Sequence, residues 1–195
     1  MIIGITGGSG TGKSYVAEIF AEYGFHIIDA DAVAKEVMLY DEGLKSRIKE
    51  YFGEEYFDEE GFVLRRKLGE RVFKNKNELE LLSSWTHPEI NKIIIEKANE
   101  LKKQNKNAIL DIPLLIGSPI MEVCDITISV MADDNLRIKR ITNRDNIDDI
   151  TARNRIKSQL TNEEYAKHTD FAIYNNGENI KNQVLEILNK YDCIG

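Results

Sequence analysis

The glycine-rich stretch GGSGTGKS, residues 7–14, has the residue types and spacing of a phosphate-binding loop. It fits the P-loop pattern, and it lies between an apolar run and an amphipathic segment, which is the context that this motif requires. Glycines allow consecutive backbone N–H groups to converge on phosphate oxygens, and the positive end of the following helix strengthens this attraction. The sequence therefore predicts a site for a nucleoside triphosphate.

Two side chains at the end of this loop are suited to act on the phosphates. Lys13 is expected to reach the β- and γ-phosphates and to take part in catalysis, and the Ser14 hydroxyl is expected to bind Mg²⁺. The predicted nucleotide-binding residues of this region are Gly8, Gly10, Thr11, Gly12, Lys13, Ser14 and Tyr15.

Two carboxylates, Asp29 and Asp31, follow the second apolar run in IIDADAVAKEV. Open α/β sheets bind ligands at the carboxyl ends of their strands, where such a pair can hold magnesium and accept the proton of an attacking hydroxyl. In the alternative interpretation, Asp29 ends the strand and Asp31 caps the next helix. An extended Ala30 would point both carboxylates to one side, whereas a turn at Ala30 would separate them. Position alone leaves these interpretations open.

A basic stretch, LRIKRITNRDNIDDITARNRIKSQ, places Arg137, Arg140 and Arg144 on one face of a predicted helix. A run of charges usually forms a solvated face. Next to a phosphate loop, however, arginines in a mobile helical flap would stabilise the charge that spreads over the transferred phosphoryl group. We favour this second interpretation.

The elements that must position these residues alternate along the chain. Short apolar runs rich in β-branched residues predict strands, and amphipathic segments between them predict helices. The predicted strands are residues 2–6, 25–29, 108–113, 126–131 and 171–174. This alternation indicates an α/β fold of the P-loop NTPase type, with a parallel five-stranded sheet covered by helices on both faces.

Two long helical intervals interrupt the alternation and divide the predicted fold into three parts. The interval 32–106 is predicted to be a helical insertion, and the interval 134–168, which we call the lid segment, is predicted to be the basic flap. The predicted nucleotide-binding core comprises residues 1–31, 107–133 and 169–195.

Composition and charge narrow the functional class. With 195 residues, 42% of them hydrophobic, the chain has the composition of an ordinary globular protein. Its net charge of −7 argues against a general affinity for nucleic acid. No apolar run approaches the length of about 20 residues that a membrane span needs, and the N-terminal run lacks the basic flank of a signal peptide. We expect a cytoplasmic protein without a nucleic-acid, membrane or obligatory protein partner.

A series of motifs resembles the dephospho-CoA kinase family over essentially the whole chain. In order, they are GITGGSGTGKS, IIDADAVAKEV, LRRKLGERVF, HPEI, DIPLL, IKRITNRD and AIYNNG. The resemblance implies transfer of the γ-phosphate of ATP, with Mg²⁺, to the ribose 3′-hydroxyl of dephospho-CoA, which gives coenzyme A in the last step of its biosynthesis. It also implies a nucleotide-binding core, a helical CoA-binding domain and a lid.

The resemblance implies roles for individual residues. Asp31, the second Asp of DAD, is the implied base and a metal ligand, and Asp29 supports it or the metal. Arg140 and Arg144 match the lid arginines, of which Arg140 is implied in catalysis and Arg144 in nucleotide binding. The implied contacts near the adenine are Asn175 and Gly177, and those of the acceptor are Asp29, Arg66, His87 and Leu114.

Three positions depart from the family pattern. Tyr15 replaces a Thr after the P-loop Ser, and Tyr174 stands where the family often has Asp. Gly117 stands where the family often has Glu, so an acceptor-side carboxylate is missing. We expect these departures to affect the affinity for the acceptor and the detailed geometry of the site. They do not change the class of reaction that the resemblance implies.

Two other functions compete with this one. Another P-loop kinase for a small molecule or nucleotide would differ mainly in the helical insertion. A GTPase switch is a rival from a different class, because NKNE at residues 75–78 is close to the guanine-reading pattern NKxD. Its Glu in place of Asp and its polar helical context argue against this rival.

Overall fold

The computed structural model describes residues 1–177 and 179–191, and the chain divides into two compact units. The first unit comprises Met1–Ile28 with Lys97–Gly195, and the second comprises Asp29–Glu96. The first unit contains the sheet and the second is mainly helical. Within the described residues, no helix combines the length and the apolar character of a membrane span.

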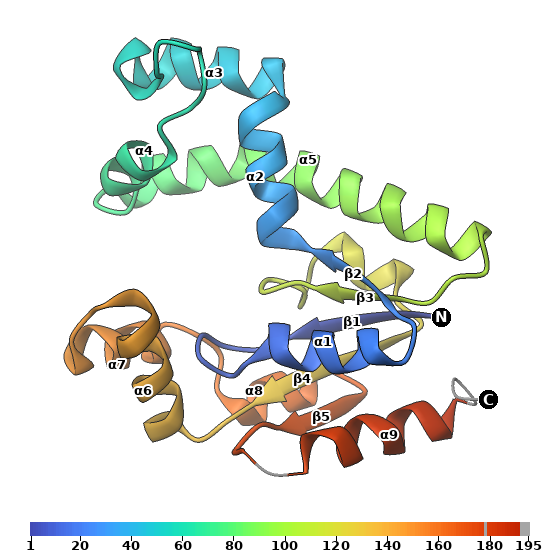
Figure 1. Cartoon of the computed structure of the whole chain (residues 1–195). Coiled ribbons are helices and arrows are strands. Elements are labelled where there is room, and N and C mark those ends of the chain that lie inside the picture. The colour runs from blue at the N-terminus through green and yellow to red at the C-terminus, as the bar shows by residue number, and fades with distance from the viewer. Residues whose placement is uncertain (178, 192–195) are drawn as a thin grey trace. The chain divides into compact units, whose positions relative to one another are not determined.

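The first unit is built on a five-stranded sheet with the strand order β2-β3-β1-β4-β5 (Figure 1). The strands are β1 (Ile2–Thr6), β2 (His26–Asp29), β3 (Ala108–Asp111), β4 (Ile126–Met131) and β5 (Phe171–Tyr174). Strand β1 pairs in parallel with β3 and β4, and β4 pairs in parallel with β5. The predicted α/β fold with its parallel five-stranded sheet is confirmed, because each predicted strand coincides with an observed one.

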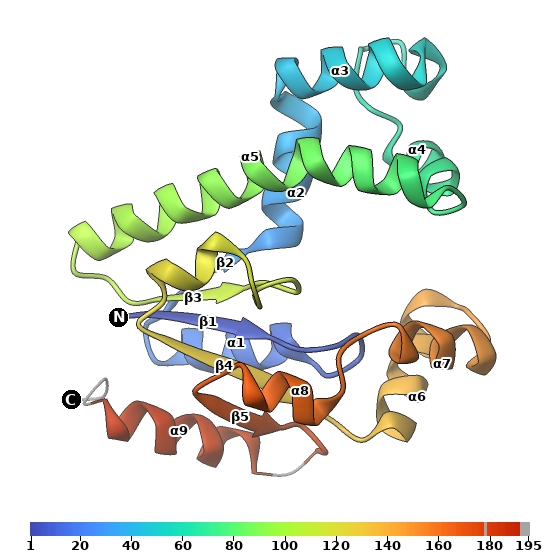
Figure 2. The same cartoon turned by 180° about the vertical axis from the view of Figure 1, so that it is seen from behind.

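Helices cover both faces of this sheet, as the two opposite views in Figures 1 and 2 show. Helices α1 (Lys13–Glu22) and α9 (Ile180–Lys190) lie on one face, where Phe20 and Val184 pack in one core cluster with Ile3 and Ile5 of β1. The 3₁₀ helix η2 (Pro119–Val123) and helix α8 (Asn162–Lys167) lie on the other face. Burial on both faces explains why the sequences of the three central strands, β3, β1 and β4, are mainly apolar.

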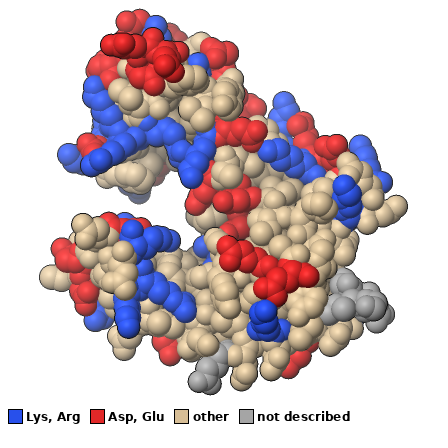
Figure 3. All heavy atoms as spheres, viewed as in Figure 1, with Lys and Arg blue, Asp and Glu red and all other residues tan. Residues whose placement is uncertain are grey.

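The lid segment contains helices α6 (Asp134–Asp145) and α7 (Asp149–Lys157), followed by α8. Ile138 and Ile141 of α6 pack against Ala152 and Ile156 of α7, which gives the pair its own small core. Thr161 and Glu164 form a reciprocal capping box that starts α8. In Figure 3, Lys and Arg side chains gather over α6 and α7.

The second unit contains helices α2 (Ala30–Tyr40), α3 (Glu42–Phe52), α4 (Arg65–Val72) and most of α5 (Lys76–Lys103), with the 3₁₀ helix η1 (Glu54–Tyr56). Arg71 of α4 lies over the ring of Phe52, 5.2 Å from its centroid, and donates two hydrogen bonds to Glu78 of α5 at 2.9 and 2.7 Å. These hydrogen bonds raise the pKa of Arg71 and lower the pKa of Glu78. This ion pair therefore ties α4 to α5 within the unit.

Candidate active site

The loop Gly7–Ser14 joins the carboxyl end of β1 to the first turn of α1. Gly10 and Gly12 have φ angles of 78° and 85°, a region that L side chains rarely adopt. A Cβ on Gly10 would also lie 2.7 Å from the carbonyl oxygen of Arg137. Both the backbone shape and the close approach of α6 therefore require glycine in this loop.

Hydrogen bonds within the loop hold its shape. The Thr11 hydroxyl donates to the Gly8 carbonyl oxygen at 2.9 Å, and Lys13 Nζ donates to the Gly7 carbonyl oxygen at 3.0 Å. The Lys13 ammonium thus lies over the start of the loop rather than extending away from it. A cation in this position, with backbone N–H groups nearby, is suited to bind the terminal phosphates of a nucleotide.

The Ser14 hydroxyl donates a hydrogen bond of 2.8 Å to Oδ2 of Asp111. Asp111 is the last residue of β3, lies opposite Ile5 of β1 and is only 5% exposed. A hydroxyl and a carboxylate oxygen side by side fit Mg²⁺, which takes oxygen ligands and commonly binds one or two carboxylates together with substrate phosphates. Asp111 was not among the site residues predicted from the sequence. Its place at the end of a buried strand could have indicated it, because open α/β sheets bind ligands at that edge.

Arg140 reaches the phosphate loop from α6. Its Nη1 donates to the carbonyl oxygens of Gly10 and Thr11 at 3.1 and 3.3 Å. Its Nη2 donates to the backbone and side-chain oxygens of Asn175 at 3.1 and 3.2 Å. Burial lowers the pKa of Arg140, but a guanidinium stays charged in proteins. A positive charge is therefore fixed beside the loop.

The loop after β5 also contacts the phosphate loop. Asn175 is buried, and its Nδ2 donates to the Thr11 carbonyl oxygen at 2.8 Å. Gly177 follows with a φ of 104°. The predicted contact of both residues with an adenine stays a prediction, whereas the Asn175 amide is already engaged with the phosphate loop.

Arg144 lies near the end of α6, with its guanidinium in a two-point ion pair with Asp145 at 2.7 and 3.0 Å. Arg155 of α7 also donates to this carboxylate. The hydrogen bond from Arg144, with a second from Arg155, lowers the pKa of Asp145 to about 2. Asp145 thus holds two lid arginines side by side and links α6 to α7.

Two other predicted contacts of the first unit are exposed side chains. Tyr15, on the first turn of α1, is 50% exposed, and Leu114, after β3, is 70% exposed. Leu115 beside it is fully buried and packs close to Gly4 of β1. Gly117 has a φ of 77°, so a glutamate at this position would adopt a conformation that L side chains rarely take.

In the second unit, Asp29 ends β2 and also caps α2. Its Oδ1 accepts a hydrogen bond of 2.8 Å from the backbone N–H of Asp31. The alternative in which Asp31 is the cap is therefore wrong, because Asp31 already lies in the first turn of the helix. The helix begins at Ala30, so the extended arrangement of the two aspartates is not formed. The Asp31 carboxylate is exposed and forms no hydrogen bond or ion pair with the described residues.

Arg66 lies on α4 beside an open groove of about 430 Å³. Its side chain is 95% exposed and pairs with Glu70 at 3.2 Å. Arg65 and Lys67 line the same groove. The motif LRRKLGERVF matches the family pattern RxxLxxxVF, in which the arginine lies three residues before the leucine. With Leu68 as that leucine the arginine is Arg65 rather than Arg66, so Arg65 is a second candidate for the acceptor contact.

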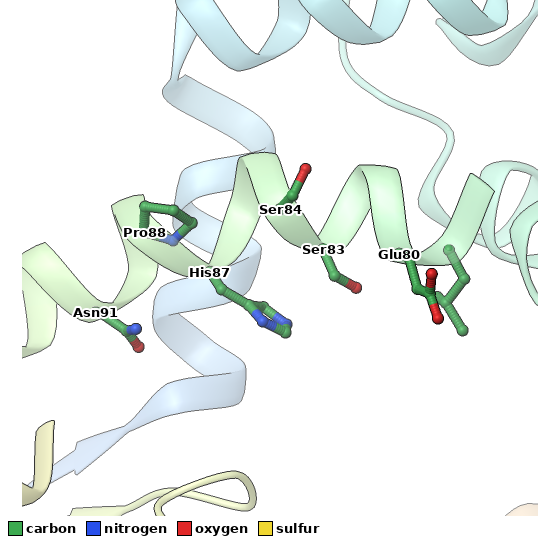
Figure 4. Close-up of a pocket in the computed structure, with 7 residues that line it drawn as sticks. Glu80, Ser83, Ser84, His87, Pro88 and Asn91 are labelled. Carbon is green, nitrogen blue, oxygen red and sulfur yellow. The ribbon is translucent and has the colours of Figure 1, made fainter. Parts of the chain in front are cut away.

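His87 lies on α5 in a groove of about 480 Å³ (Figure 4). The side chains of Glu80, Ser83, His87 and Asn91 point to the same side of the helix. Pro88, inside α5, points to another side, so it leaves this polar row intact. The contact of His87 with the acceptor stays a prediction.

Comparison with known proteins places the chain in a family. The family model for dephospho-CoA kinase matches residues 1–181. The chain belongs to the dephospho-CoA kinase family. A dephospho-CoA kinase of Fusobacterium nucleatum is 42% identical over 176 residues, which cover 90% of each chain. One of Carboxydothermus hydrogenoformans is 37% identical over 97% of this chain and 94% of the relative.

A solved structure agrees with this membership. Dephospho-CoA kinase from Campylobacter jejuni superposes with a TM-score of 0.74 at 29% identity, over 97% of this chain and 96% of that chain. As a member of the dephospho-CoA kinase family, the protein is a kinase that phosphorylates dephospho-CoA in the last step of coenzyme A biosynthesis, and its family uses a nucleotide substrate.

The GTPase alternative finds no support in this family or in the structure. Asn75 and Glu78 of the NKNE stretch serve the start of α5: Asn75 Oδ1 accepts from the backbone N–H groups of Asn77 and Glu78 at 3.1 and 3.3 Å. The Glu78 carboxylate pairs with Arg71. These side chains are therefore used in capping and in packing two helices together.

Proposed function

We propose that the loop Gly7–Ser14 binds ATP and that Lys13 draws the γ-phosphate toward the 3′-hydroxyl of dephospho-CoA. The observation that carries this proposal is the loop geometry: glycines at positive φ, an ammonium over the loop, and a helix that starts at Lys13. The family membership supplies the acceptor.

We assign Mg²⁺ to Ser14 and Asp111. Their oxygens are adjacent, and Asp111 is held at the end of a central strand, so its position is fixed by the sheet. When bound, the ion neutralises charge on the phosphates as the bond to the leaving ADP breaks. The family resemblance implied that Asp31 is both the base and a metal ligand, and of these two roles we now propose only the base.

Asp31 is the proposed base. Its carboxylate accepts the proton of the ribose 3′-hydroxyl, the hydroxyl oxygen forms a bond to the γ-phosphorus, and the bond from phosphorus to the β,γ-bridging oxygen breaks, which leaves ADP and coenzyme A. The exposed, unengaged carboxylate on the first turn of α2 suits this role. Asp29 supports it by fixing that turn.

Arg140 and Arg144 are the proposed lid arginines. Charge spreads over the equatorial oxygens of the transferred phosphoryl group, and fixed guanidinium groups stabilise it. Arg140 is held on the loop carbonyls, and Arg144 is oriented by Asp145. Arg140 therefore acts from a fixed position, whereas Arg144 is 62% exposed and reaches the phosphates from the lid segment.

The second unit is the proposed acceptor domain, with Arg66 and His87 as acceptor contacts, and Leu114 adds one from the first unit. Both grooves of the second unit combine polar and apolar lining residues, which suits a ligand with phosphate groups and an extended organic chain. A cytoplasmic location and the lack of nucleic-acid or protein partners stay predictions.

The decisive experiment is incubation of the purified protein with Mg-ATP and dephospho-CoA, with product analysis by chromatography. We expect ADP and coenzyme A in equal amounts, and no coenzyme A from Lys13→Ala, which loses the ammonium that draws the γ-phosphate. ATP hydrolysis with the acceptor unchanged would overturn the proposal. Equal turnover by Lys13→Ala would overturn the role of the loop.

A further inference from the structure

Ser9, in the first half of the phosphate loop, has all its polar groups bound by two side chains from the lid segment. Its N–H donates to Gln159 Oε1 at 2.9 Å, and its hydroxyl accepts from Gln159 Nε2 at 3.0 Å. Its carbonyl oxygen accepts from Arg137 Nε at 3.0 Å. Each polar group of Ser9 is therefore held by a side chain of the lid segment.

Arg137 and Gln159 also hold each other. Arg137 Nη2 donates to the same Gln159 Oε1 at 3.0 Å, and Nη1 donates to Asp134 at 3.1 Å. Arg137 is only 3% exposed, so its rotamer is fixed by packing as well as by hydrogen bonds. The two side chains come from α6 and from the turn between α7 and α8, and therefore join two separate parts of the lid segment to the loop.

The glycines of the loop permit this contact. A Cβ on Gly8 would lie 2.8 Å from Gln159 Oε1, and a Cβ on Gly10 would meet the backbone of Arg137. In the sequence, phosphate binding alone accounted for these glycines. The structure shows a second requirement, since side chains here would push the lid segment away from Ser9.

The position of Ser9 indicates which phosphate is affected. The P-loop lysine reaches the β- and γ-phosphates. Lys13 Nζ lies on the Gly7 carbonyl oxygen, at the end of the loop that contains Ser9. The start of α1, whose positive dipole end also attracts phosphate, lies at the other end of the loop, beyond Gly12. The clamp on Ser9 is thus at the γ-phosphate end.

We propose that Arg137 and Gln159 are positioning residues, which clamp Ser9 and so fix the γ-phosphate end of the loop for phosphoryl transfer. The inference rests on the proposed binding of ATP to this loop. Neither side chain needs to touch the nucleotide: Gln159 fixes the backbone through Ser9, and Arg137 fixes Gln159 while it adds a buried positive charge close to the phosphates. Because the residues belong to the lid segment, the lid and the loop move together.

The test uses Gln159→Met, which removes the amide but keeps a side chain of similar length. We expect kcat to fall about 100-fold, the cost of misplacing a reacting group by about 1 Å. The dissociation constant of ADP should not change, because ADP has no γ-phosphate, whereas a nonhydrolysable ATP analogue should bind more weakly. Binding of both nucleotides is measured by calorimetry without the acceptor. Gln104→Met, which changes an exposed glutamine at the end of α5, is the matched control and should match wild type.

Different results would overturn the clamp and the proposed function. An unchanged kcat in a folded Gln159→Met variant, or equal weakening of ADP and of the ATP analogue, would overturn the clamp. Should Gln159→Met fail to fold, Gln159→Ser, with a short polar side chain, is measured in its place against the same two criteria. Failure of wild type to phosphorylate dephospho-CoA would instead overturn the proposed function, while the comparison of ADP with the ATP analogue still tests the clamp.

A double variant supplies a further readout. If Arg137 and Gln159 act as one clamp, the kcat of Arg137→Met with Gln159→Met together should equal that of the more impaired single variant. Two independent structural effects would multiply instead, and this result would contradict a shared clamp.

Discussion

The Ser14 hydroxyl lies 2.8 Å from Oδ2 of Asp111, and this contact joins the phosphate loop to the end of the neighbouring strand β3. The pairing of β1 with β3, which places Ile5 opposite Asp111, fixes the position of the carboxylate, and the first turn of α1 carries the Ser14 hydroxyl to it. The proposed Mg²⁺ ligands are therefore in place before the nucleotide binds.

Asp111→Asn tests this metal site. The amide keeps the shape but loses the charge that attracts Mg²⁺, so the magnesium concentration for half-maximal rate should rise, and saturating magnesium should restore part of the rate. The measurement is the kinase rate across a magnesium titration. The same magnesium dependence in wild type and variant would remove Asp111 from the site.

Arg140→Met tests the charge fixed beside the loop. We expect kcat to fall by about 100- to 1,000-fold, the usual effect of losing one preorganised group that stabilises transition-state charge. The affinity for ATP should change much less, because this charge matters most when the phosphoryl group is partly transferred. Steady-state kinetics, with ATP binding measured separately, give both quantities. A change confined to ATP binding would make Arg140 a ground-state contact.

The pair of Asp145 with Arg144 and Arg155 predicts a dependence of stability on pH. In the folded protein the pKa of Asp145 is lowered from 3.8 to about 2, so its contribution is fully present above pH 3.8 and is lost as the pH falls toward 2. Between pH 3.8 and about 2, the free energy of unfolding of Asp145→Asn should therefore decrease less than that of wild type. Urea unfolding of both proteins at several pH values measures it, and parallel curves would contradict the prediction.

The sequence predicted the elements of this fold because their apolar periods are local. Strands 2–6 and 126–131 are mainly apolar and are buried at every position, as expected for central strands of a sheet covered on both faces. The clamp on Ser9 was not predictable in this way, since Gln159 lies 150 residues away from it and a glutamine in a polar helical stretch carries no signal of its own. Arg137 was placed on the correct helix, but its burial against the loop depends on tertiary packing.

Asp29 and Asp31 show what the structure adds to a motif. Their positions in the sequence left the roles of the two carboxylates open, and the family resemblance implied Asp31 as the base. The hydrogen bond from the Asp31 N–H to Asp29 Oδ1 gives Asp29 a structural task that Asp31 does not share. Substitutions at the two positions should therefore differ in kind.

Asp31→Asn should lower kcat by about 100- to 10,000-fold, the usual worth of a general base, because the amide cannot accept the ribose proton. The free energy of unfolding should stay near that of wild type, since the exposed carboxylate has no partner among the described residues.

Asp29→Asn should retain most activity, because asparagine caps helices as well as aspartate does, whereas Asp29→Ala should lose about 1 kcal/mol of stability. Kinase assays across a magnesium titration, together with urea unfolding, separate these effects. If magnesium rescued Asp31→Asn, or if Asp29→Asn were the more impaired enzyme, Asp31 would be the metal-side residue and the base would have to be reassigned to Asp29.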